Sequence, residues 1–351
     1  MPPVRETTAA IELDHLVKRF PHSSQNAVDD ISLWVHSGET FGVLGPNGAG
    51  KSTTIGILTT LVRPTSGRAS ICGIDVVADP IGARQRIAVV PQRNNLDRIL
   101  RVREILTFHA AYHGVPRKIR DARADQLLEE FGLSARRNEK LGLISGGMEQ
   151  RLMVARALMN EPEVLFLDEP TNNLDPQSRR FLWERIRALH ERGVTIVLTT
   201  HDMEEADQLC ERIAIMDQGR ILALDTPAQL KRLIPGGTLL QLRIGLPLAV
   251  PSGHYAGSAT SAPDSERVRE ALARLPGVTD VVAVAEASDP SIISEPATFD
   301  FQLTSIGDAG GLIAGAVREV VAVEGRLLDL RFAQPSLEDV FIYLTGRKLR
   351  S

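Results

Sequence analysis

A glycine-rich segment, Gly45–Ser52, carries the clearest chemical signal because it fits the pattern G-x-x-x-x-G-K-[ST]. Without Cβ atoms, its backbone N–H groups can turn toward phosphate oxygens, and the following helix adds the positive end of its dipole. The lysine of this pattern supplies a charge to the β- and γ-phosphates, and the serine hydroxyl can ligate magnesium. A ligand-free strand-to-helix turn is the alternative, but the whole motif and both flanks are present. We expect these residues at a nucleotide: Gly45, Asn47, Gly48, Ala49, Gly50, Lys51, Ser52 and Thr53.

Two adjacent carboxylates, Asp168 and Glu169, follow the apolar run Val164–Leu167. An acid at the carboxyl end of a parallel strand can reach magnesium beside bound phosphates. Adjacent carboxylates repel each other unless a cation lies near them, which disfavours the alternative of a solvated acidic turn. We therefore expect Asp168 to hold magnesium and Glu169 to orient and polarise the attacking water.

The elements that must position these groups alternate between short apolar and longer amphipathic runs from Ile11 to about Leu233, which predicts an α/β domain on a largely parallel sheet. Thr40–Leu44 is expected as the first buried strand. The other expected strands are Ala88–Val90, Val164–Leu167, Thr195–Thr199 and Arg212–Met216, with a hairpin into Arg220–Leu224. The expected helices are Lys51–Thr60, Val102–Tyr112, Arg117–Phe131, Gly147–Met159, Pro176–Arg192 and Met203–Leu209.

The composition changes after the Pro-Gly-Gly at residues 235–237, which predicts domains at residues 1–235 and 236–351. Residues 247–265 are rich in small and polar types and are expected to form a mobile loop. A small α+β domain with the ferredoxin-like order βαββαβ is expected around this loop. Its elements would be Leu239–Ile244, Glu266–Arg274, Val278–Ala285, Thr298–Leu303, Gly311–Val320 and Arg326–Phe332. A last helix, Ser336–Leu344, would follow, with Ser336 as N-cap and Asp339 at the capping-box position.

The composition of the chain excludes several other classes of protein. Its 351 residues are 43% hydrophobic and 24% charged, which is ordinary globular usage and favours two domains. Met1–Ala10 does not resemble a secretory signal, and no run approaches the roughly 20 apolar residues that span a bilayer. The two cysteines, Cys72 and Cys210, fit a reducing compartment and no zinc site. A net charge of −4 favours no nucleic-acid partner, although it does not exclude a local basic patch.

The segment Ile144–Met148 resembles the signature Leu-Ser-Gly-Gly-Gln of ABC ATPases, although Ser-Gly-Gly alone is also a common helix-entry turn. With the motifs above, the resemblance to this family covers Ile11 to about Leu233 and implies a P-loop NTPase domain with a helical subdomain at about 93–160. It implies that Ser145 and Gly147 contact the γ-phosphate held by the opposite protomer, so the active unit would be a dimer. Met148 cannot donate a hydrogen bond as the family's glutamine does.

Four further positions resemble motifs of the same family. Gln92 resembles the Q-loop glutamine, which senses magnesium and the attacking water, and His201 resembles the switch histidine. Asp175 resembles the D-loop aspartate. Phe20 matches the aromatic residue that stacks on adenine, with a core phenylalanine as the alternative. A lone histidine at such a strand end is more often a cap or core residue, but the neighbouring motifs favour the switch role.

Within this family, a single phosphate loop and a single signature argue against the two-cassette translation factors. The segment between them shows no heptad run, which argues against DNA-repair relatives. The ending Ala333–Phe341 resembles the ATPases of drug-resistance and nodulation-factor exporters, although an ordinary capped helix is the alternative. The resemblance implies ATP and Mg²⁺, a second copy of the chain, and separate permease subunits as its membrane contact on the inner face. An importer ATPase and a soluble non-transport ATPase are the alternatives, and the cargo is not encoded in a recognisable site.

Overall fold

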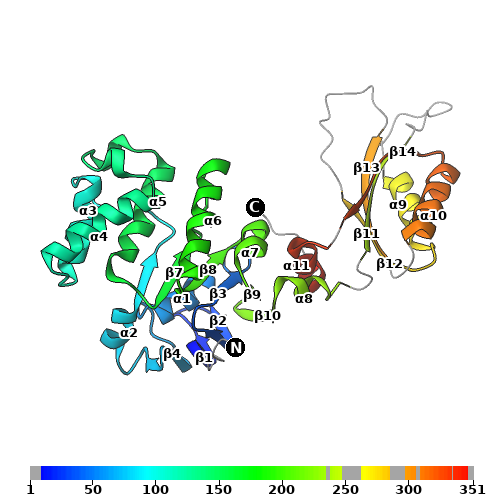
Figure 1. The fold of residues 1–351 in the computed structure, drawn as a ribbon. Coiled ribbons are helices and arrows are strands. Elements are labelled where there is room, and N and C mark those ends of the chain that lie inside the picture. The colour runs from blue at the N-terminus through cyan, green and yellow to red at the C-terminus, as the bar shows by residue number, and fades with distance from the viewer. Residues whose placement is uncertain are drawn as a thin grey trace, which may run out of the picture. The chain divides into compact units, whose positions relative to one another are not determined.

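The computed structural model describes residues 9–234, 238–246, 262–284, 297–305, 309–333 and 335–346. The chain separates into two compact units, one formed by residues up to Pro227 together with those from Leu344, and the other by Ala228–Tyr343 (Figure 1). The domain boundary expected at residues 235–236 lies outside the described residues, as do residues 247–261 of the expected mobile loop. Among the described residues, no helix has the length and apolar character needed to cross a membrane.

A six-stranded sheet forms the centre of the first unit, in the order β10-β9-β3-β8-β7-β6. Its strands are β3 (Thr40–Leu44), β6 (Ile87–Val90), β7 (Val164–Asp168), β8 (Thr195–Thr200), β9 (Arg212–Asp217) and β10 (Arg220–Asp225). All pairs are parallel except β9 with β10. The strands read as continuous apolar runs because a parallel sheet is covered on both faces. Their carboxyl ends lie at one edge, where Leu44 pairs with Thr200 and Asp168 with Thr199.

A second, antiparallel sheet in the order β2-β1-β4-β5 was not expected, so Thr40–Leu44 is not the first buried strand. Its strands are β1 (Ala9–Lys18), β2 (Val28–His36), β4 (Ser66–Ile71) and β5 (Ile74–Asp75). Register shifts interrupt the apolar alternation of β1, where His15 has a φ of 46°, and β2 contains Asp30 with a φ of 56°. Because bulges break the period of two, the pattern of these strands is hard to detect in the sequence.

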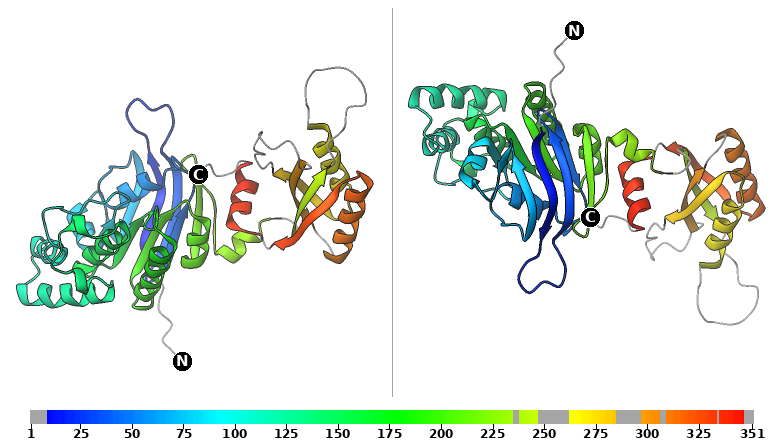
Figure 2. Two further views of the ribbon diagram at one scale, coloured as in Figure 1. Left: turned by 90° about the horizontal axis from the view of Figure 1, so that it is seen from above. Right: turned by 90° about the horizontal axis from the view of Figure 1, so that it is seen from below.

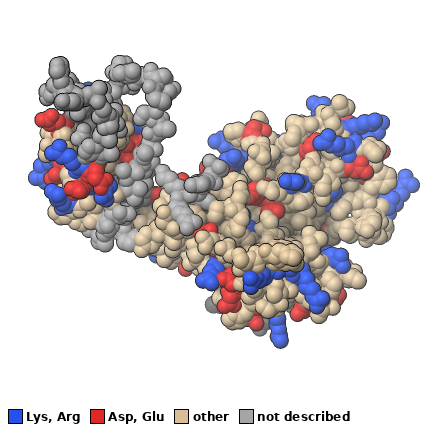
Figure 3. Space-filling model, turned by 180° about the vertical axis from the view of Figure 1, so that it is seen from behind, with Lys and Arg blue, Asp and Glu red and all other residues tan. Residues whose placement is uncertain are grey.

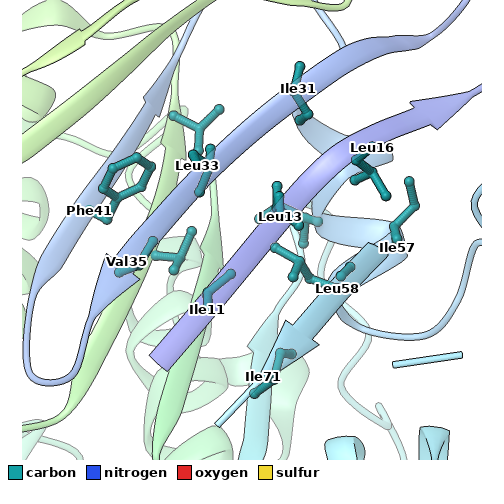
Figure 4. Close-up of a cluster of buried hydrophobic side chains, with 14 of the residues drawn as sticks. Ile11, Leu13, Leu16, Ile31, Leu33, Val35, Phe41, Ile57, Leu58 and Ile71 are labelled. Atoms are coloured by element: carbon teal, nitrogen blue, oxygen red, sulfur yellow. The ribbon is translucent and has the colours of Figure 1, made fainter. Parts of the chain in front are cut away.

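This antiparallel sheet shares an apolar core with β3 and with α1 (Lys51–Leu58), as Figure 4 shows. The labelled core residues are Ile11, Leu13, Leu16, Ile31, Leu33, Val35, Phe41, Ile57, Leu58 and Ile71. Since β3 and α1 flank the phosphate loop, the core fixes both ends of that loop.

Helices of the first unit follow the expected pattern, with small differences at their ends. Helices α3 (Val102–Tyr112), α4 (Arg117–Glu130) and α5 (Gly146–Ala157) lie together at one end of the unit (Figures 1 and 2). Together with short 3-10 turns at 134–136, 141–143 and 158–160, they lie within residues 102–160. The remaining helices of the unit are α2 (Pro80–Arg86), α6 (Pro176–Glu191) and α7 (Met203–Leu209).

The second unit contains the expected βαββαβ order, with the antiparallel sheet order β12-β13-β11-β14. Its elements are β11 (Thr238–Leu246), α9 (Ala262–Ala273), β12 (Val278–Val284), β13 (Ala297–Ser305), α10 (Ala309–Ala322) and β14 (Arg326–Ala333). Alternate residues of β11 and β13, such as Leu240, Leu242 and Phe301, are buried against α9 and α10 on one face. Helix α9 begins at Ala262, so residues 262–265 are helical and not part of the expected loop.

Two further helices are α8 (Pro227–Lys231) and α11 (Leu337–Thr345). Ser336 and Asp339 form the expected capping box before α11, since each side chain accepts a hydrogen bond from the other's backbone N–H. On the face shown in Figure 3, basic and acidic side chains are interspersed over the described surface.

Candidate functional site

The phosphate loop joins β3 to α1, and its glycines are required for two different reasons. A Cβ atom at Gly45 would clash with the carbonyl oxygen of Met216, and one at Gly50 with that of Ala27. Gly48 has a φ of 86°, and a Cβ atom at this position would meet no other atom within 4 Å. The loop is therefore packed from behind at Gly45 and Gly50 but open at Gly48. Gly50 is the N-cap of α1, so the helix N-terminus opens on the same loop.

Lys51 is the first residue of α1 and is only 5% exposed. Its Nζ donates to the carbonyl oxygens of Gly45 (2.6 Å) and Pro46 (3.1 Å) and lies 3.8 Å from Oε1 of Glu169. Burial lowers the pKa of Lys51, whereas the charges of Glu169 and Asp168 raise it. The ammonium group is thus held inside the loop, directed toward the end of β7. Ser52 is exposed on the same turn, and Thr53 is half-buried.

Asp168 and Glu169 end β7 in different environments. One Asp168 oxygen accepts a hydrogen bond from the Thr199 hydroxyl of β8. Glu169 has a φ of 48°, a left-handed conformation that costs a non-glycine residue about 1–3 kcal/mol. Its N–H donates to the Thr199 carbonyl oxygen at 2.9 Å. The two acids therefore differ in backbone conformation and in hydrogen-bond partners.

The Glu169 carboxylate, in a residue that is 7% exposed, is the point where several segments of the first unit converge. Oε2 accepts hydrogen bonds from Gln92 Nε2 (2.7 Å) and Asn172 Nδ2 (3.1 Å). Oε1 lies 3.2 Å from His201 Nδ1 and 3.8 Å from Lys51 Nζ. The structure therefore brings together four residues that were expected from separate motifs, Lys51, Gln92, Glu169 and His201.

Asn172 and Thr199 belong to this site but were not identified from the sequence. Thr199 contacts both acids, and Asn172 binds Glu169 directly. Thr199 could have been identified as a site residue because it is a polar residue at the end of an apolar strand. For Asn172, the only such feature is its position three residues after Glu169.

Ser145, Gly147 and Asp175 form a separate group at the N-termini of α5 and α6. Ser145 caps α5 by accepting from the N–H of Met148 at 3.3 Å, and Asp175 caps α6 by accepting from Gln177 and Ser178. A Cβ atom on Gly147 would clash with Oγ of Ser178. Among the described residues, no hydrogen bond or ion pair joins this group to Lys51, Asp168 or Glu169.

Phe20 follows β1 and is 42% exposed, which rules out the alternative interpretation that it is a core phenylalanine. The Nζ of Lys18 lies 4.9 Å from the centre of its ring. An exposed ring beside a cation leaves one aromatic face available for stacking.

The residues present fit a nucleotide and its magnesium ion. The open loop at Gly48, the helix N-terminus and the buried Lys51 ammonium group are complementary to phosphate oxygens. Ser52 and the second carboxylate oxygen of Asp168 offer the hard oxygen ligands that magnesium prefers. A parallel sheet with this loop at its carboxyl edge, and with an acid at the end of β7, which β8 separates from β3, defines a P-loop nucleoside triphosphatase.

Comparison with known proteins narrows this class. The family model described as ABC transporter matches residues 28–172. A Nod factor export ATP-binding protein I of Burkholderia thailandensis is 37% identical over 349 residues, covering 98% of this chain and 99% of its own. A daunorubicin/doxorubicin resistance ATP-binding protein of Streptomyces peucetius is 38% identical over 341 residues, covering 97% and 94%. The chain belongs to the ABC transporter ATP-binding protein family, and it is an ATP hydrolase.

Solved structures agree for the first unit. A structure described as the ATP-binding subunit of an ABC transporter covers 64% of this chain and 93% of its own, with 32% identity and a TM-score of 0.59. A dimeric ATP-binding cassette in a post-hydrolysis state with ADP and phosphate covers 62% and 98%, with 28% identity and a TM-score of 0.56. The relatives named for Nod factor export and daunorubicin resistance confirm the resemblance to exporter ATPases that the motifs indicated.

Proposed function

We propose that this chain powers an ABC exporter as a dimer docked on separate permease subunits at the inner face of the cell membrane. The observation that carries the proposal is the convergence of Lys51, Gln92 and His201 on the buried carboxylate of Glu169. The cargo class we propose is a drug, a lipid or another amphipathic molecule, because the relatives that match nearly the whole chain are named for Nod factor export and daunorubicin resistance.

Glu169 acts as the general base in this proposal. Its carboxylate is held by two amide donors, Gln92 and Asn172, which fix its orientation. His201 lies against the other oxygen, where it can stabilise charge on the γ-phosphate, and Lys51 neutralises the β- and γ-phosphates. Gln92 reports the state of the site because it contacts Glu169 from a loop after β6.

Magnesium would be held by Ser52 and Asp168, with Gln92 as a third oxygen ligand. The ion supplies charge neutralisation at the phosphates. The hydrogen bond from Thr199 holds one oxygen of Asp168 and fixes the orientation of that carboxylate. Adenine would stack on the exposed ring of Phe20.

The dimer in this proposal rests on Ser145, Gly147 and Asp175, the group at the N-termini of α5 and α6. Ser145 is exposed, and its group makes no hydrogen bond to the Lys51–Glu169 cluster among the described residues. We infer that Ser145, Gly147 and Asp175 complete the site of the opposite protomer. A relative by structure is described as dimeric, which supports this arrangement.

Heterodimers with two differently tagged chains test this proposal directly. Gly146→Asp adds a carboxylate at the exposed first residue of α5, where a Cβ meets nothing within 4 Å, so the protomer should fold. A heterodimer of Lys51→Ala with Gly146→Asp keeps one intact composite site and should hydrolyse ATP. A heterodimer of the double variant with the parent keeps no intact composite site and should not.

The opposite pattern contradicts the proposal. If each chain forms its own complete site, the parent subunit of the second heterodimer stays active and the first heterodimer is inactive. Reconstitution with the co-purifying membrane subunits, measured as ATP-dependent export of labelled amphipathic compounds, then tests the transport step.

A further inference from the structure

Glu205 on α7 is a buried carboxyl group outside the proposed catalytic group. It is 1% exposed, and a buried acid of this kind is rare unless it is paired or hydrogen-bonded. Its Oε1 accepts hydrogen bonds from the hydroxyl of Thr171 (2.7 Å) and from the indole N–H of Trp183 (3.2 Å). The Thr200 hydroxyl is its third hydrogen-bond partner.

The positions of these partners in the chain link Glu205 to the catalytic group. Thr171 lies two residues after Glu169, on the loop that follows β7. Thr200 is the last residue of β8 and directly precedes His201. The Glu205 carboxyl group is therefore hydrogen-bonded to both segments that carry Glu169 and His201. Its remaining partner, Trp183, lies on α6, which carries neither residue.

Glu205 lines a small polar pocket together with residues of both segments, including Glu169, Thr171, Thr200 and His201. Asp202 and Arg179 also line it, and they form an ion pair at 3.3 Å. Burial raises the pKa of Glu205, and the hydrogen bonds from Thr171, Thr200 and Trp183 lower it. Burial is the larger effect, so the pKa of this carboxyl lies above its ordinary value.

We propose that Glu205 is a positioning residue for ATP hydrolysis, which holds the loops after β7 and β8 so that His201 stays within reach of Glu169. The 3.2 Å separation of His201 Nδ1 from Glu169 Oε1 is the geometry it maintains. This proposal rests on the catalytic roles proposed above for Glu169 and His201. A displacement of about 1 Å in such a group lowers turnover by up to about a hundredfold without a contact to substrate.

The test compares removal of the threonine hydroxyls of the two loops with removal of the Trp183 indole N–H, which donates to the same carboxyl group. In the full-length protein, Thr171→Val and Thr200→Val should each lower kcat by about tenfold or more, with KM for ATP within about twofold of the parent. Thr171→Ser retains the hydroxyl and should recover the parent kcat. Trp183→Phe is the matched control, because it removes one bond to Glu205 and also leaves a cavity in the core, while Trp183 belongs to α6 and to neither loop.

Thermal unfolding measured on the same samples separates positioning from general destabilisation. Trp183→Phe should lower Tm at least as much as Thr171→Val while its kcat stays near that of the parent. Equal losses of kcat in Trp183→Phe and Thr171→Val would overturn the positioning role, as would parent-like kcat in both threonine variants. If Glu169→Gln is inactive while the threonine variants stay active, only this inference fails, whereas an active Glu169→Gln contradicts the proposed function itself.

Discussion

At the residue scale, the site depends on one carboxylate that several groups share. Glu169 accepts two amide donors and lies near one imidazole and one ammonium group. These contacts fix the orientation of the carboxylate that we propose as the general base. The strained backbone at Glu169 places the side chain within reach of all four, and such strain is common at functional sites.

Replacement of this acid by its amide should separate ATP binding from hydrolysis. Glu169→Gln keeps the shape of the side chain but removes the base, so we expect near-parent ATP affinity and a loss of turnover of about 10²- to 10⁴-fold. ATP-trapped dimers should accumulate and be visible by sedimentation. Glu163→Gln, the same change at a half-exposed position just before β7, is the control and should hydrolyse ATP normally. Parent-like turnover in Glu169→Gln would remove this residue from the base role.

Substitutions of Lys51 and His201 should affect different quantities, ATP affinity and turnover respectively. Lys51→Ala removes a charge from the loop and leaves the carbonyl oxygens of Gly45 and Pro46 without their donor. A hydrogen bond to a charged group contributes about 1.5–3 kcal/mol, so calorimetry should show ATP affinity reduced by about 10- to 150-fold. His201→Ala should bind ATP normally and lose turnover. Lys118→Ala, on α4, serves as a charge-deletion control, and unchanged affinity in Lys51→Ala would contradict the phosphate cradle.

At the element scale, helix N-termini connect the two groups of site residues to the fold. Gly50, Ser145, Asp175 and Asp202 are the N-caps of α1, α5, α6 and α7. Ser145 and Asp175 have proposed roles themselves, whereas Gly50 directly precedes Lys51 and Asp202 directly follows His201. The close packing of Gly147 on Ser178 also holds α5 against α6. The glycine is thus required within one protomer, independently of any role across a dimer.

The cap at Asp175 gives a prediction on the pH dependence of stability. Hydrogen bonds from Ser178, from its hydroxyl and its N–H, lower the pKa of the Asp175 carboxyl, so its contribution is present above the ordinary pKa and is lost as the pH falls below it. Asp175→Ala should therefore lower Tm at pH 7, and the difference from the parent should shrink in acid. Asp175→Asn keeps a neutral cap and should stay close to the parent at pH 7.

The same pair of variants separates the cap from a role in dimerisation. If Asp175 serves only as a cap, Asp175→Asn should hydrolyse ATP at the parent rate. A stable but inactive Asp175→Asn would assign the charge a function beyond α6. A Tm difference between Asp175→Ala and the parent that grows in acid would contradict the assigned direction of the pKa.

At the scale of the whole molecule, the chemistry and the second unit occupy separate parts of the chain. Each unit has a buried core of its own, with Phe41 and Phe166 in the first and Phe301 in the second. All residues proposed to contact ATP lie between Phe20 and His201, within the first unit. We propose that the second unit stabilises the proposed dimer or its contact with the permease.

A truncated chain ending at Leu233 should test this division. We expect calorimetry to show ATP binding within about twofold of the full-length protein, since Lys51, Ser52 and Asp168 are retained. Sedimentation should show weaker ATP-dependent dimer formation. Loss of ATP binding itself would mean that the second unit completes the nucleotide fold, and unchanged dimer formation would exclude the stabilising role.

The local sequence determined the parts of this protein that depend on short-range physics. The loop at Gly45–Ser52, the apolar strand ending at Asp168 and the βαββαβ order were predictable because motif, periodicity and caps are properties of neighbouring residues. The antiparallel sheet was missed because bulges near His15 interrupt its alternation. Only the tertiary structure decided that Gln92 and His201 meet at Glu169, that Asn172 joins them, and that Glu205 bonds to Thr171 and Thr200. These contacts join residues from different strand ends, and their distances are set by the parallel register and the packing of α6 and α7, which no local pattern specifies.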